Sequence, residues 1–437
     1  MKGIPSILWH YVRSKYGRRF RSREELLAWQ DKKVRNFLTD ILPKSQFYRT
    51  YYQGLNVRDW QQFPIIDKSK MMTNFDQLNT VEIKKSEAFS VALEAEQTRD
   101  FSSTIGNFTV GLSSGTSGNR GLFILSEQEQ GAWAGTILAK ALPQSLLTRQ
   151  RIGFFLRANS KLYQTVKRKH LHFEYFDLLF PLEKHIERLN QYLPTILIAP
   201  PSMLRLLAEA QASGSLNIAP LKIISVAEVL DPLDETYISQ VFNQIVHQLY
   251  QCTEGFLAAT CAYGTIHLNE DIVVIQKDYL DKNAGKFTPI ITDFFRTTQP
   301  IIRYRLDDIL TEQKIPCLCG SVFTAIESIE GRCDDIFYLE SQQNEKLVPI
   351  FPDFIRRAII TASTHIQEYI VVQKSPDLIE IYLNTPAELQ TQVQAQVSTS
   401  LLALFDRLNC KIPEVRYQEY KITRQPDKKL RRVHREF

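Results

Sequence analysis

A stretch rich in glycine and hydroxyl residues has the composition of a phosphate-binding loop. Residues 110–126, VGLSSGTSGNRGLFILS, hold four of the chain's 17 glycines, with serine and threonine between them. Glycine lets a backbone approach a phosphate closely and turn its N–H groups inward, and hydroxyl groups add donors. The Gly-Lys-Ser/Thr of a Walker loop does not follow. Because apolar runs flank the stretch, a plain hairpin loop is the alternative.

A second group of polar side chains lies in residues 248–261, QLYQCTEGFLAATC. Tyr250 has a ring that can stack on a base, and Thr253 has a hydroxyl that can bond a phosphate. Glu254 can ligate Mg²⁺, which takes carboxylate and phosphate oxygens together. The alternative is an ordinary Thr-Glu-Gly turn that follows a helix.

Two further segments bear charges suited to a nucleotide. In residues 298–310, TQPIIRYRLDDIL, Asp307 and Asp308 follow an apparent strand, where a carboxylate can accept both hydroxyls of a ribose. Residues 422–433, ITRQPDKKLRRV, carry lysines that can reach a transferring phosphoryl group if the segment is mobile. The plainer interpretations are an exposed edge strand and a solvated basic tail.

Four residues have the types and spacing of a structural zinc site. Cys317 and Cys319 form a Cys-x-Cys pair, and five residues separate Cys261 from His267. If the two pairs meet, they can form a tetrahedral Cys₃His site, and a closed site of four ligands has a structural and not a catalytic role. Buried thiols that pack as small apolar groups are the alternative. Six cysteines in a chain this long do not predict a secreted disulfide framework.

An α/β fold must position these segments. Between residues 120 and 310, apolar runs alternate with helical patterns, which is typical of βαβ units in a mixed or parallel sheet covered by helices. The elements expected there are strands at 151–158, 195–200 and 221–230, a helix at 201–214, and a mainly helical segment at 231–251. Residues 22–41 predict a helix with Ser22 as its N-cap, because Glu25 follows three residues later.

After about residue 330 the pattern becomes that of a small α+β unit. The expected elements are a strand–turn–strand and helix over 331–359, a hairpin over 366–385, a helix over 388–408 and a strand over 414–422. A Gly-containing charged turn, Gly331–Asp335, predicts the linker between the two units.

The composition and the distribution of charge exclude several classes of protein. The chain has 437 residues, 44% hydrophobic and 23% charged, which indicates globular domains rather than a disordered or collagen-like protein. Residues 1–23 hold seven basic and no acidic side chains, residues 421–437 carry a net charge of +5, and the stretch between sums to −7. Basic ends can contact an anionic membrane, a nucleotide-bearing cofactor or an acidic carrier protein. We expect no nucleic acid partner, because the body of the chain is acidic.

Neither a membrane span nor a secretory signal is expected. The most apolar stretch, LPTILIAPPSMLRLLAEA, is interrupted by prolines and by Arg205. Near the N-terminus, ILWHYVRSKYGRRF mixes aromatic and basic residues, as an amphipathic helix does, and no cleavage site of small residues follows. We therefore expect a cytoplasmic protein without an integral membrane segment.

The order of these segments resembles the adenylate-forming (ANL) superfamily. It is most similar to the phenylacetate–CoA ligase-like branch and its relatives that adenylate other coenzymes. The resemblance runs from roughly residue 40 to 437 and includes FPIIDKSKMM, VAEVL, IRYRLDD and GRCDD. It implies a large ATP- and substrate-binding domain, residues 1–331, and a small mobile domain, residues 332–437, that carries a catalytic lysine.

The resemblance also implies a role for each matching residue. The residues expected to hold the β- and γ-phosphates of ATP are Ser113, Ser114, Gly115, Thr116, Ser117 and Gly118. Those expected around adenine and ribose are Ala227, Glu228, Tyr250, Asp308 and Arg332, with Asp334 or Asp335 as the hinge. The expected catalytic residues are Thr253 at the α-phosphate, Glu254 at Mg²⁺ and Lys429 at the charge that develops during transfer.

The implied function is activation of a small-molecule carboxylic acid by ATP as an acyl-adenylate, followed by transfer to a thiol of CoA or an acyl carrier protein. Three departures from the family's pattern keep alternatives open. Arg120 stands where many relatives have a lysine, and Asp307 and Lys428 replace glycines, so that Lys428 competes with Lys429 for one role. The alternatives are an enzyme that stops at the adenylate or transfers AMP without a thioester, and a nucleotide-binding protein without turnover.

Overall fold

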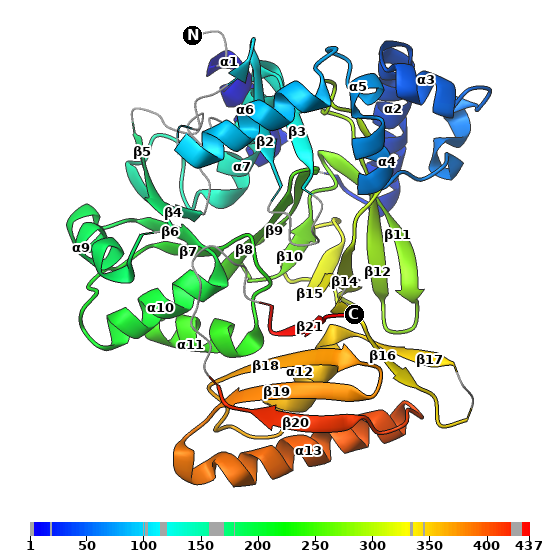
Figure 1. Ribbon diagram of the computed structural model, residues 1–437. Helices are drawn as coiled ribbons and strands as arrows, with labels where there is room; N and C mark the ends of the chain where they lie inside the picture. The colour runs from blue at the N-terminus through cyan, green and yellow to red at the C-terminus, as the bar shows by residue number, and fades with distance from the viewer. Residues whose placement is uncertain are drawn as a thin grey trace.

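One long mixed sheet organises the chain up to Arg332 in the computed structural model (Figure 1). The structure describes residues 4–17, 20–98, 100, 104–113, 120–156, 170–178, 180–332, 335–343, 346–420 and 431–437. The strands of the sheet follow the order β11-β12-β14-β15-β10-β9-β8-β7-β6-β4-β5, and β13 pairs with β12. This architecture confirms the predicted α/β class.

The sheet has a parallel half and an antiparallel half, which meet at β8. The parallel strands are β4 (Gln150–Leu156), β5 (Leu171–Asp177), β6 (Ile196–Ala199), β7 (Lys222–Ser225) and β8 (Val246–Cys252). The antiparallel strands are β9 (Gly255–Thr260), β10 (Ile266–Leu268), β11 (Val273–Asp281), β12 (Lys286–Asp293), β13 (Ile301–Arg305), β14 (Asp308–Glu312) and β15 (Ala325–Arg332).

Helices cover both faces of the parallel half, as its apolar strands require. On one face, the core contains Phe155 and is closed by α9 (Leu182–Tyr192), α10 (Pro201–Ala212) and α11 (Pro232–Phe242). On the other face, Ile152 and Phe154 face α7 (Glu127–Ala141), and α1 (Ile4–Val12) packs on α7. The alternation of Phe154 and Phe155 between the two cores reflects the two-residue period of a strand.

One predicted helix is partly a strand. The expectation of a mainly helical segment at 231–251 holds only for α11, and β8 follows it. Asn243 ends the helix in the left-handed conformation with a φ of 52°, which asparagine tolerates well. From Val246 the backbone instead pairs with β7 on one side and β9 on the other. That prediction was wrong because tertiary pairing outweighed a helical pattern.

The N-terminal region adds helices and a small sheet to the large unit. Ser22 caps α2 (Arg23–Ile41) by accepting a hydrogen bond from the backbone N–H of Glu25, as predicted. The remaining helices are α3 (Gln46–Tyr51), α4 (Lys68–Thr73), α5 (Phe75–Leu78) and α6 (Lys85–Thr98). The small sheet contains β1 (Thr104–Ile105), β2 (Phe108–Leu112) and β3 (Leu122–Leu125). None of the described helices has both the length and the apolarity needed to cross a bilayer.

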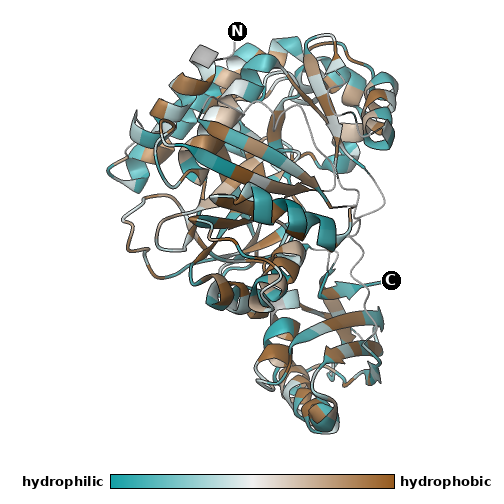
Figure 2. Cartoon of the chain, turned by 90° about the vertical axis from the view of Figure 1, so that its left-hand side faces the viewer, coloured by the Kyte–Doolittle hydropathy of each residue, from teal (hydrophilic) through white to brown (hydrophobic). Residues whose placement is uncertain are grey.

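The C-terminal α+β unit has a core of its own and stands below the large unit in both views (Figures 1 and 2). Its elements are β16 (Phe337–Glu340), β17 (Leu347–Ile350), α12 (Pro352–Ile360), β18 (Glu368–Ser375), β19 (Leu378–Asn384), α13 (Gln390–Arg407), β20 (Glu414–Gln418) and β21 (Val433–Arg435). The order of these elements up to β20 agrees with the sequence prediction.

The end of the chain is not a solvated tail. Strand β21 pairs in parallel with β18, and Arg432 and Val433 are buried. Sequence analysis did not foresee this strand, because three residues among basic neighbours give no strand pattern. The basic segment that carries the lysines is therefore followed by an ordered strand.

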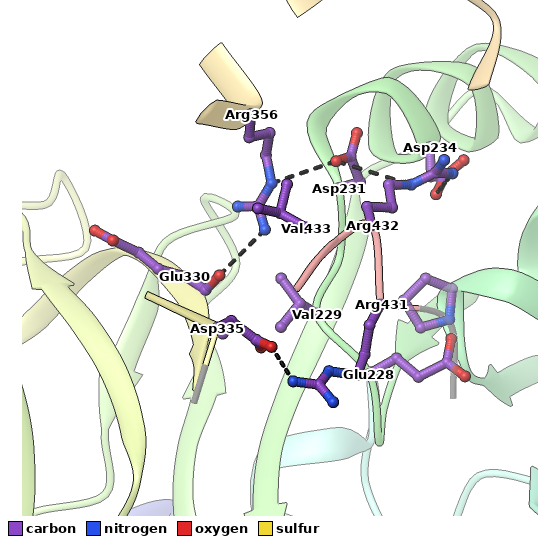
Figure 3. A pocket seen from close by; sticks show the side chains of 12 residues that line it. Glu228, Val229, Asp231, Asp234, Glu330, Asp335, Arg356, Arg431, Arg432 and Val433 are labelled. Atoms are coloured by element: carbon purple, nitrogen blue, oxygen red, sulfur yellow. Dashed lines mark hydrogen bonds and ion pairs between the residues drawn. The ribbon is translucent and has the colours of Figure 1, made fainter. Parts of the chain in front are cut away.

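A buried ionic cluster joins the two units (Figure 3). Arg432 lies 2.5 Å from a carboxylate oxygen of Asp234 and donates to the backbone carbonyl of Tyr369. The hydroxyl of Tyr369 donates to Asp231 at 2.6 Å, and Arg356 lies 3.4 Å from the same oxygen of Asp231. The aspartates belong to α11 and its N-cap, whereas the arginines and the tyrosine belong to the C-terminal unit.

We predict that Arg432→Leu strongly destabilises the protein. Burial raises the pKa of Asp234, and the charge of Arg432 opposes that rise. Removal of the arginine leaves the buried Asp234 with a longer ion pair to Arg205, at 3.6 Å. Loss of one partner of a buried ion pair costs about 3–5 kcal/mol. Urea unfolding followed by circular dichroism measures the loss.

Lys411→Leu is the matched control for that substitution. Lys411 forms an ion pair with Glu340 on the surface of the C-terminal unit, where both side chains are at least half exposed. Surface pairs of this kind contribute little to stability. Equal unfolding midpoints for the two variants would contradict the role given to the cluster.

Candidate functional site

A cavity of about 830 Å³ opens where the two halves of the sheet meet. Segments far apart in the sequence form its wall. The predicted nucleotide-site residues among the described residues all line it: Ser113, Ala227, Glu228, Tyr250, Thr253, Glu254, Asp308 and Arg332. Ser114 to Gly118, Lys428 and Lys429 lie outside the described residues.

The turn between β8 and β9 places a carboxylate at the wall of the cavity. Glu254 is only 8% exposed, and both of its oxygens accept hydrogen bonds. Thr253 donates to one oxygen at 2.7 Å and Tyr304 donates to the other at 2.9 Å. Arg296 holds the turn by donating to the backbone carbonyl of Thr253 at 3.1 Å. Each carboxylate oxygen retains a lone pair that can accept from, or ligate, a group in the cavity.

A second buried tyrosine binds the other predicted carboxylate. The hydroxyl of Tyr250 donates to Asp308 at 2.5 Å. Burial and the neighbouring carboxylates raise the pKa of both Tyr250 and Tyr304, so both hydroxyls stay protonated and act as donors. Burial and Glu254 also raise the pKa of Cys252, which keeps this thiol neutral. Tyrosine donors therefore orient both acids of the site.

The two apolar runs that flank the glycine-rich stretch pair with each other as antiparallel strands. Leu112 of β2 pairs with Leu122 of β3, and the hydroxyl of Ser113 accepts from the N–H of Gly121 at 2.7 Å. Lys68, at the start of α4, reaches within 3.5 Å of the same hydroxyl. A lysine therefore stands beside the loop.

Arg120, which the sequence offered as the cation of this loop, is engaged elsewhere. Its guanidinium lies 2.5 Å from a carboxylate oxygen of Glu96 and donates to the backbone carbonyl of Ser113. Lys68 also lines the cavity, whereas Arg120 does not line it. The lysine of FPIIDKSKMM thus both approaches the hydroxyl of Ser113 and lines the cavity.

The segment after β7 contributes the next part of the wall. Ala227 adopts a positive φ of 69°, which turns the backbone sharply at the end of the strand. The carboxylate of Glu228 accepts from the N–H of Ser202 at 3.2 Å, at the start of α10. A backbone held in this way can lie flat against a planar ligand.

Charged residues close the cavity where the two units meet. Arg332, at the end of β15, pairs with Asp307 at 3.0 Å. Arg431 pairs with Asp335, and both of these residues line the cavity as well as the smaller pocket in Figure 3. Asp335 also accepts from the N–H of Arg332 at 3.4 Å. The predicted hinge thus contacts the segment that follows the two lysines.

The other end of the cavity is apolar and follows the axis of α7. One residue of each turn of α7 reaches the wall, namely Glu129, Trp133, Ile137 and Ala141, and Ala132, Thr136 and Leu138 line it beside them. Twelve residues of helix span about 18 Å. Trp133 donates to Gln251 beside the β8–β9 turn at 3.2 Å, so the N-terminal end of α7 is the end nearer to Glu254. The opposing sheet contributes apolar side chains, including Ile152, Phe154 and Ile198.

The four predicted zinc ligands lie together. The ligand atoms of Cys261, His267, Cys317 and Cys319 are all within 4.8 Å of one another. The sulfurs of Cys261 and Cys317 are 3.7 Å apart, and Nε2 of His267 is 3.3 Å from the sulfur of Cys319. Bonds of zinc to sulfur and nitrogen place tetrahedral ligand atoms about 3.3–3.8 Å apart, so these residues fit the ion.

The histidine in this group is oriented by its second ring nitrogen. Nδ1 of His267 lies 3.2 Å from the backbone carbonyl of Phe323, which favours the tautomer with the proton on Nδ1. Nε2 is then available as a ligand. Backbone N–H groups of Tyr263 and Cys319 also point to the sulfurs of Cys261 and Cys317.

Sequence reasoning assigned no role to several residues on the wall. Tyr304 lies in the IRYRLDD segment, and Lys68 lies in FPIIDKSKMM, but their separation from the other motifs hid their contacts. The spacing of Pro64 and Lys68 was the available signal for the lysine. For Arg431, the sequence offered no indication of a place on the wall other than its basic neighbours.

Comparison with known proteins agrees with this arrangement. No protein-family model matches the chain. Protein CapK from Staphylococcus aureus is 22% identical over 382 residues, which are 84% of this chain and 80% of that protein. Among solved structures, 2-hydroxyisobutyryl-CoA ligase in its postadenylation state overlaps with a TM-score of 0.70 at 15% identity, over 97% of this chain and 91% of that one. This chain has the fold of the adenylate-forming ligases.

The structural overlap is lower for another state of this CoA ligase and for a second enzyme of the same fold. For the same CoA ligase in its thioesterification state, the TM-score is 0.57 at 16% identity, over 98% of this chain and 92% of that one. For the amide bond synthetase McbA from Marinactinospora thermotolerans it is 0.52 at 13% identity, over 74% of this chain and 67% of that one. The overlap of the adenylate-forming fold is therefore greater with the postadenylation arrangement.

Proposed function

We propose that this protein uses ATP to activate a carboxylic acid as an acyl-adenylate and then transfers the acyl group to a thiol. The observation that carries the proposal is the convergence of eight separately predicted residues on one cavity. Within the superfamily, we place the chain in the phenylacetate–CoA ligase-like branch. The thiol belongs to CoA or to an acyl carrier protein, and the domains divide at residues 331 and 332.

The proposed binding of ATP uses the polar end of the cavity. Ser113 and the loop after it hold the β- and γ-phosphates, with Lys68 as a neighbouring cation. The wall of the base site is formed by Ala227, Glu228 and Tyr250. Asp308 accepts the ribose hydroxyls, and Arg332 contacts ribose or phosphate.

In the proposed first step, a carboxylate oxygen attacks the α-phosphorus of ATP, and the bond to pyrophosphate breaks. Thr253 would turn its hydroxyl from Glu254 to the α-phosphate, and Glu254 would hold Mg²⁺, which supplies charge neutralisation when bound. In the second step, a thiolate attacks the acyl carbon and AMP leaves. The carboxylate is ionised at neutral pH, and the thiol loses its proton to solvent to form the attacking thiolate, so neither step requires a general base in the site.

The catalytic lysine is proposed to be Lys429, with Lys428 as its competitor. Arg431 lines the cavity only two residues after Lys429, and an extended residue spans at most about 3.6 Å. A lysine at position 429 can therefore reach the cavity. The greater overlap with the postadenylation arrangement also suits the first step.

The apolar end of the cavity supports an extended apolar acid as the substrate. Its carboxylate would lie near Thr253, and its apolar part would follow α7 toward Ala141. Apart from Glu129, the α7 residues on the wall are uncharged, and Glu129 is already bonded to the backbone N–H groups of Thr297 and Thr298. An apolar chain or ring system would bury its surface there without separating a charge from water.

We predict acid-dependent ATP–pyrophosphate exchange that requires one lysine. Lys429→Ala should lower the exchange rate about 10²–10³-fold, the range seen when one donor to the developing charge is removed. Lys428→Ala should have a small effect, and Lys411→Ala, on the surface of the same unit, should have none. Full exchange in both Lys428→Ala and Lys429→Ala would refute the role of the segment. Exchange without thioester, with CoA or a carrier protein present, would favour the enzyme that stops at the adenylate.

We predict that Ala141→Leu makes the longest acids poor substrates and leaves short acids as good ones. The added methyl groups would fill the far end of the cavity, so kcat/KM for the longest acids should fall about 10–100-fold while short acids are unaffected. Ala139→Leu is the control, because Ala139 is on α7 but does not line the cavity. Equal losses for long and short acids would contradict this placement of the acyl group.

We also propose a structural zinc ion at the Cys₃His group, and predict about one zinc per chain by elemental analysis. The double substitution Cys317→Ser and Cys319→Ser should abolish zinc binding and lower the melting temperature. Cys410→Ser, a buried thiol in the C-terminal unit, should leave the zinc content unchanged. A purified protein without zinc that also fails to take up added zinc would rule the site out.

A further inference from the structure

The outward face of α1 and of the turn after it exposes large apolar side chains. The inward face is fixed by the burial of Ile7 and Tyr11 against α7. The two helices are so close that a Cβ atom at Gly135 would lie 2.4 Å from the carbonyl oxygen of Ile7. The exposed residues lie about one turn apart on the other side: Leu8 (49% exposed), Trp9 (53%), Val12 (52%) and Tyr16 (55%).

A neighbouring loop extends this surface. Lys15 donates to the backbone carbonyl of Gln144 at 3.2 Å, which holds the loop after α7 beside the turn after α1. That loop carries Leu147, which is 82% exposed, and Arg149, which is also exposed. We call these five exposed apolar residues, with Arg13, Lys15 and Arg149, the N-terminal patch.

The charged members of the N-terminal patch, Arg13, Lys15 and Arg149, are all basic, and Asp271 is an acidic neighbour of Arg13. Residues 1–23 contain seven basic and no acidic residues. The guanidinium of Arg13 lies 4.6 Å from the centre of the Trp9 ring, so its charge sits at the edge of the apolar surface. Arg23 is engaged with Glu270 at 2.5 Å and is not counted in the patch.

We propose that the N-terminal patch binds the surface of an anionic lipid bilayer. A helix that buries one face in the protein and presents tryptophan, tyrosine and aliphatic residues with flanking arginine and lysine on the other has the pattern of an interfacial anchor. The apolar side chains enter the headgroup region, and the basic side chains pair with anionic headgroups. This inference goes beyond the proposed function and does not depend on it.

A second copy of the chain is a poorer occupant of the same surface. A two-fold dimer through the N-terminal patch would bring the basic segments of both chains together without acidic partners from residues 1–23. A bilayer instead offers the opposite charge. The C-terminal unit lies at the other end of the molecule from α1 (Figure 1), so a bilayer at α1 leaves that unit unobstructed.

The test is flotation of the full chain with phosphatidylcholine vesicles that contain or lack phosphatidylglycerol. We expect binding only to the anionic vesicles, weakened by added salt. Trp9→Glu should abolish binding, and Lys15→Glu should weaken it at least about fivefold. Ile412→Glu, an equally exposed apolar residue in the C-terminal unit, should bind as the wild type does. Melting temperatures confirm that each variant is folded.

The location of the contact is tested by fluorescence. Brominated lipid in the anionic vesicles should quench tryptophan emission, and Trp9→Phe should remove the quenched component. Three results would overturn the proposal: no binding to anionic vesicles, equal binding by Trp9→Glu, or a dimer in solution that Trp9→Glu converts to a monomer. The last result would assign the patch to a second copy.

Discussion

Strand β8 constrains the whole site, because it pairs in parallel with β7 and antiparallel with β9. Ligand sites in α/β sheets form where strand direction or order changes, since neighbouring connections then diverge and leave a crevice. Here Tyr250 and Glu254 lie on one wall of the crevice. Asp308 and Tyr304, from the antiparallel half, form hydrogen bonds with them. The two tyrosine–carboxylate bonds across this boundary hold the site together.

The same boundary explains why polar and apolar ends coexist in one cavity. On the parallel side, α7 and the sheet present apolar side chains to each other, because a two-layer core requires them. On the antiparallel side, the end of β15 and the start of the C-terminal unit supply charged residues. A ligand with a charged end and an apolar end is complementary to this division, and an acyl-adenylate is such a ligand.

Local patterns were sufficient to predict much of the fold and to find the site. The period of apolar residues gave β4, β6, α10 and the C-terminal hairpin, and the unusual clusters of glycine, hydroxyl and charged residues gave the walls of the cavity. The sequence of residues 246–250 was assigned to a helix, because Val246, Leu249 and Tyr250 also fit a helical spacing. Only pairing with distant strands decides such a case.

Contacts between distant residues could not be predicted in the same way. Two examples are the hydrogen bond from Tyr250 to Asp308 and the approach of Lys68 to Ser113. Both depend on how distant segments of the chain pack against each other, which no local pattern encodes. The pairing of Arg120 with Glu96 was hidden for the same reason. The four cysteine and histidine residues were an exception, since metal ligands have a restricted set of residue types and spacings.

The path of the chain around Lys429 has a mechanical consequence. Strand β20 before that segment and strand β21 after it are opposite edges of one four-stranded sheet. The proposed catalytic lysine therefore lies in a segment whose two flanking strands belong to the same sheet. Under the proposed function, any rotation of the C-terminal sheet would carry both ends of this segment together, so the position of the lysine would follow the orientation of the whole unit.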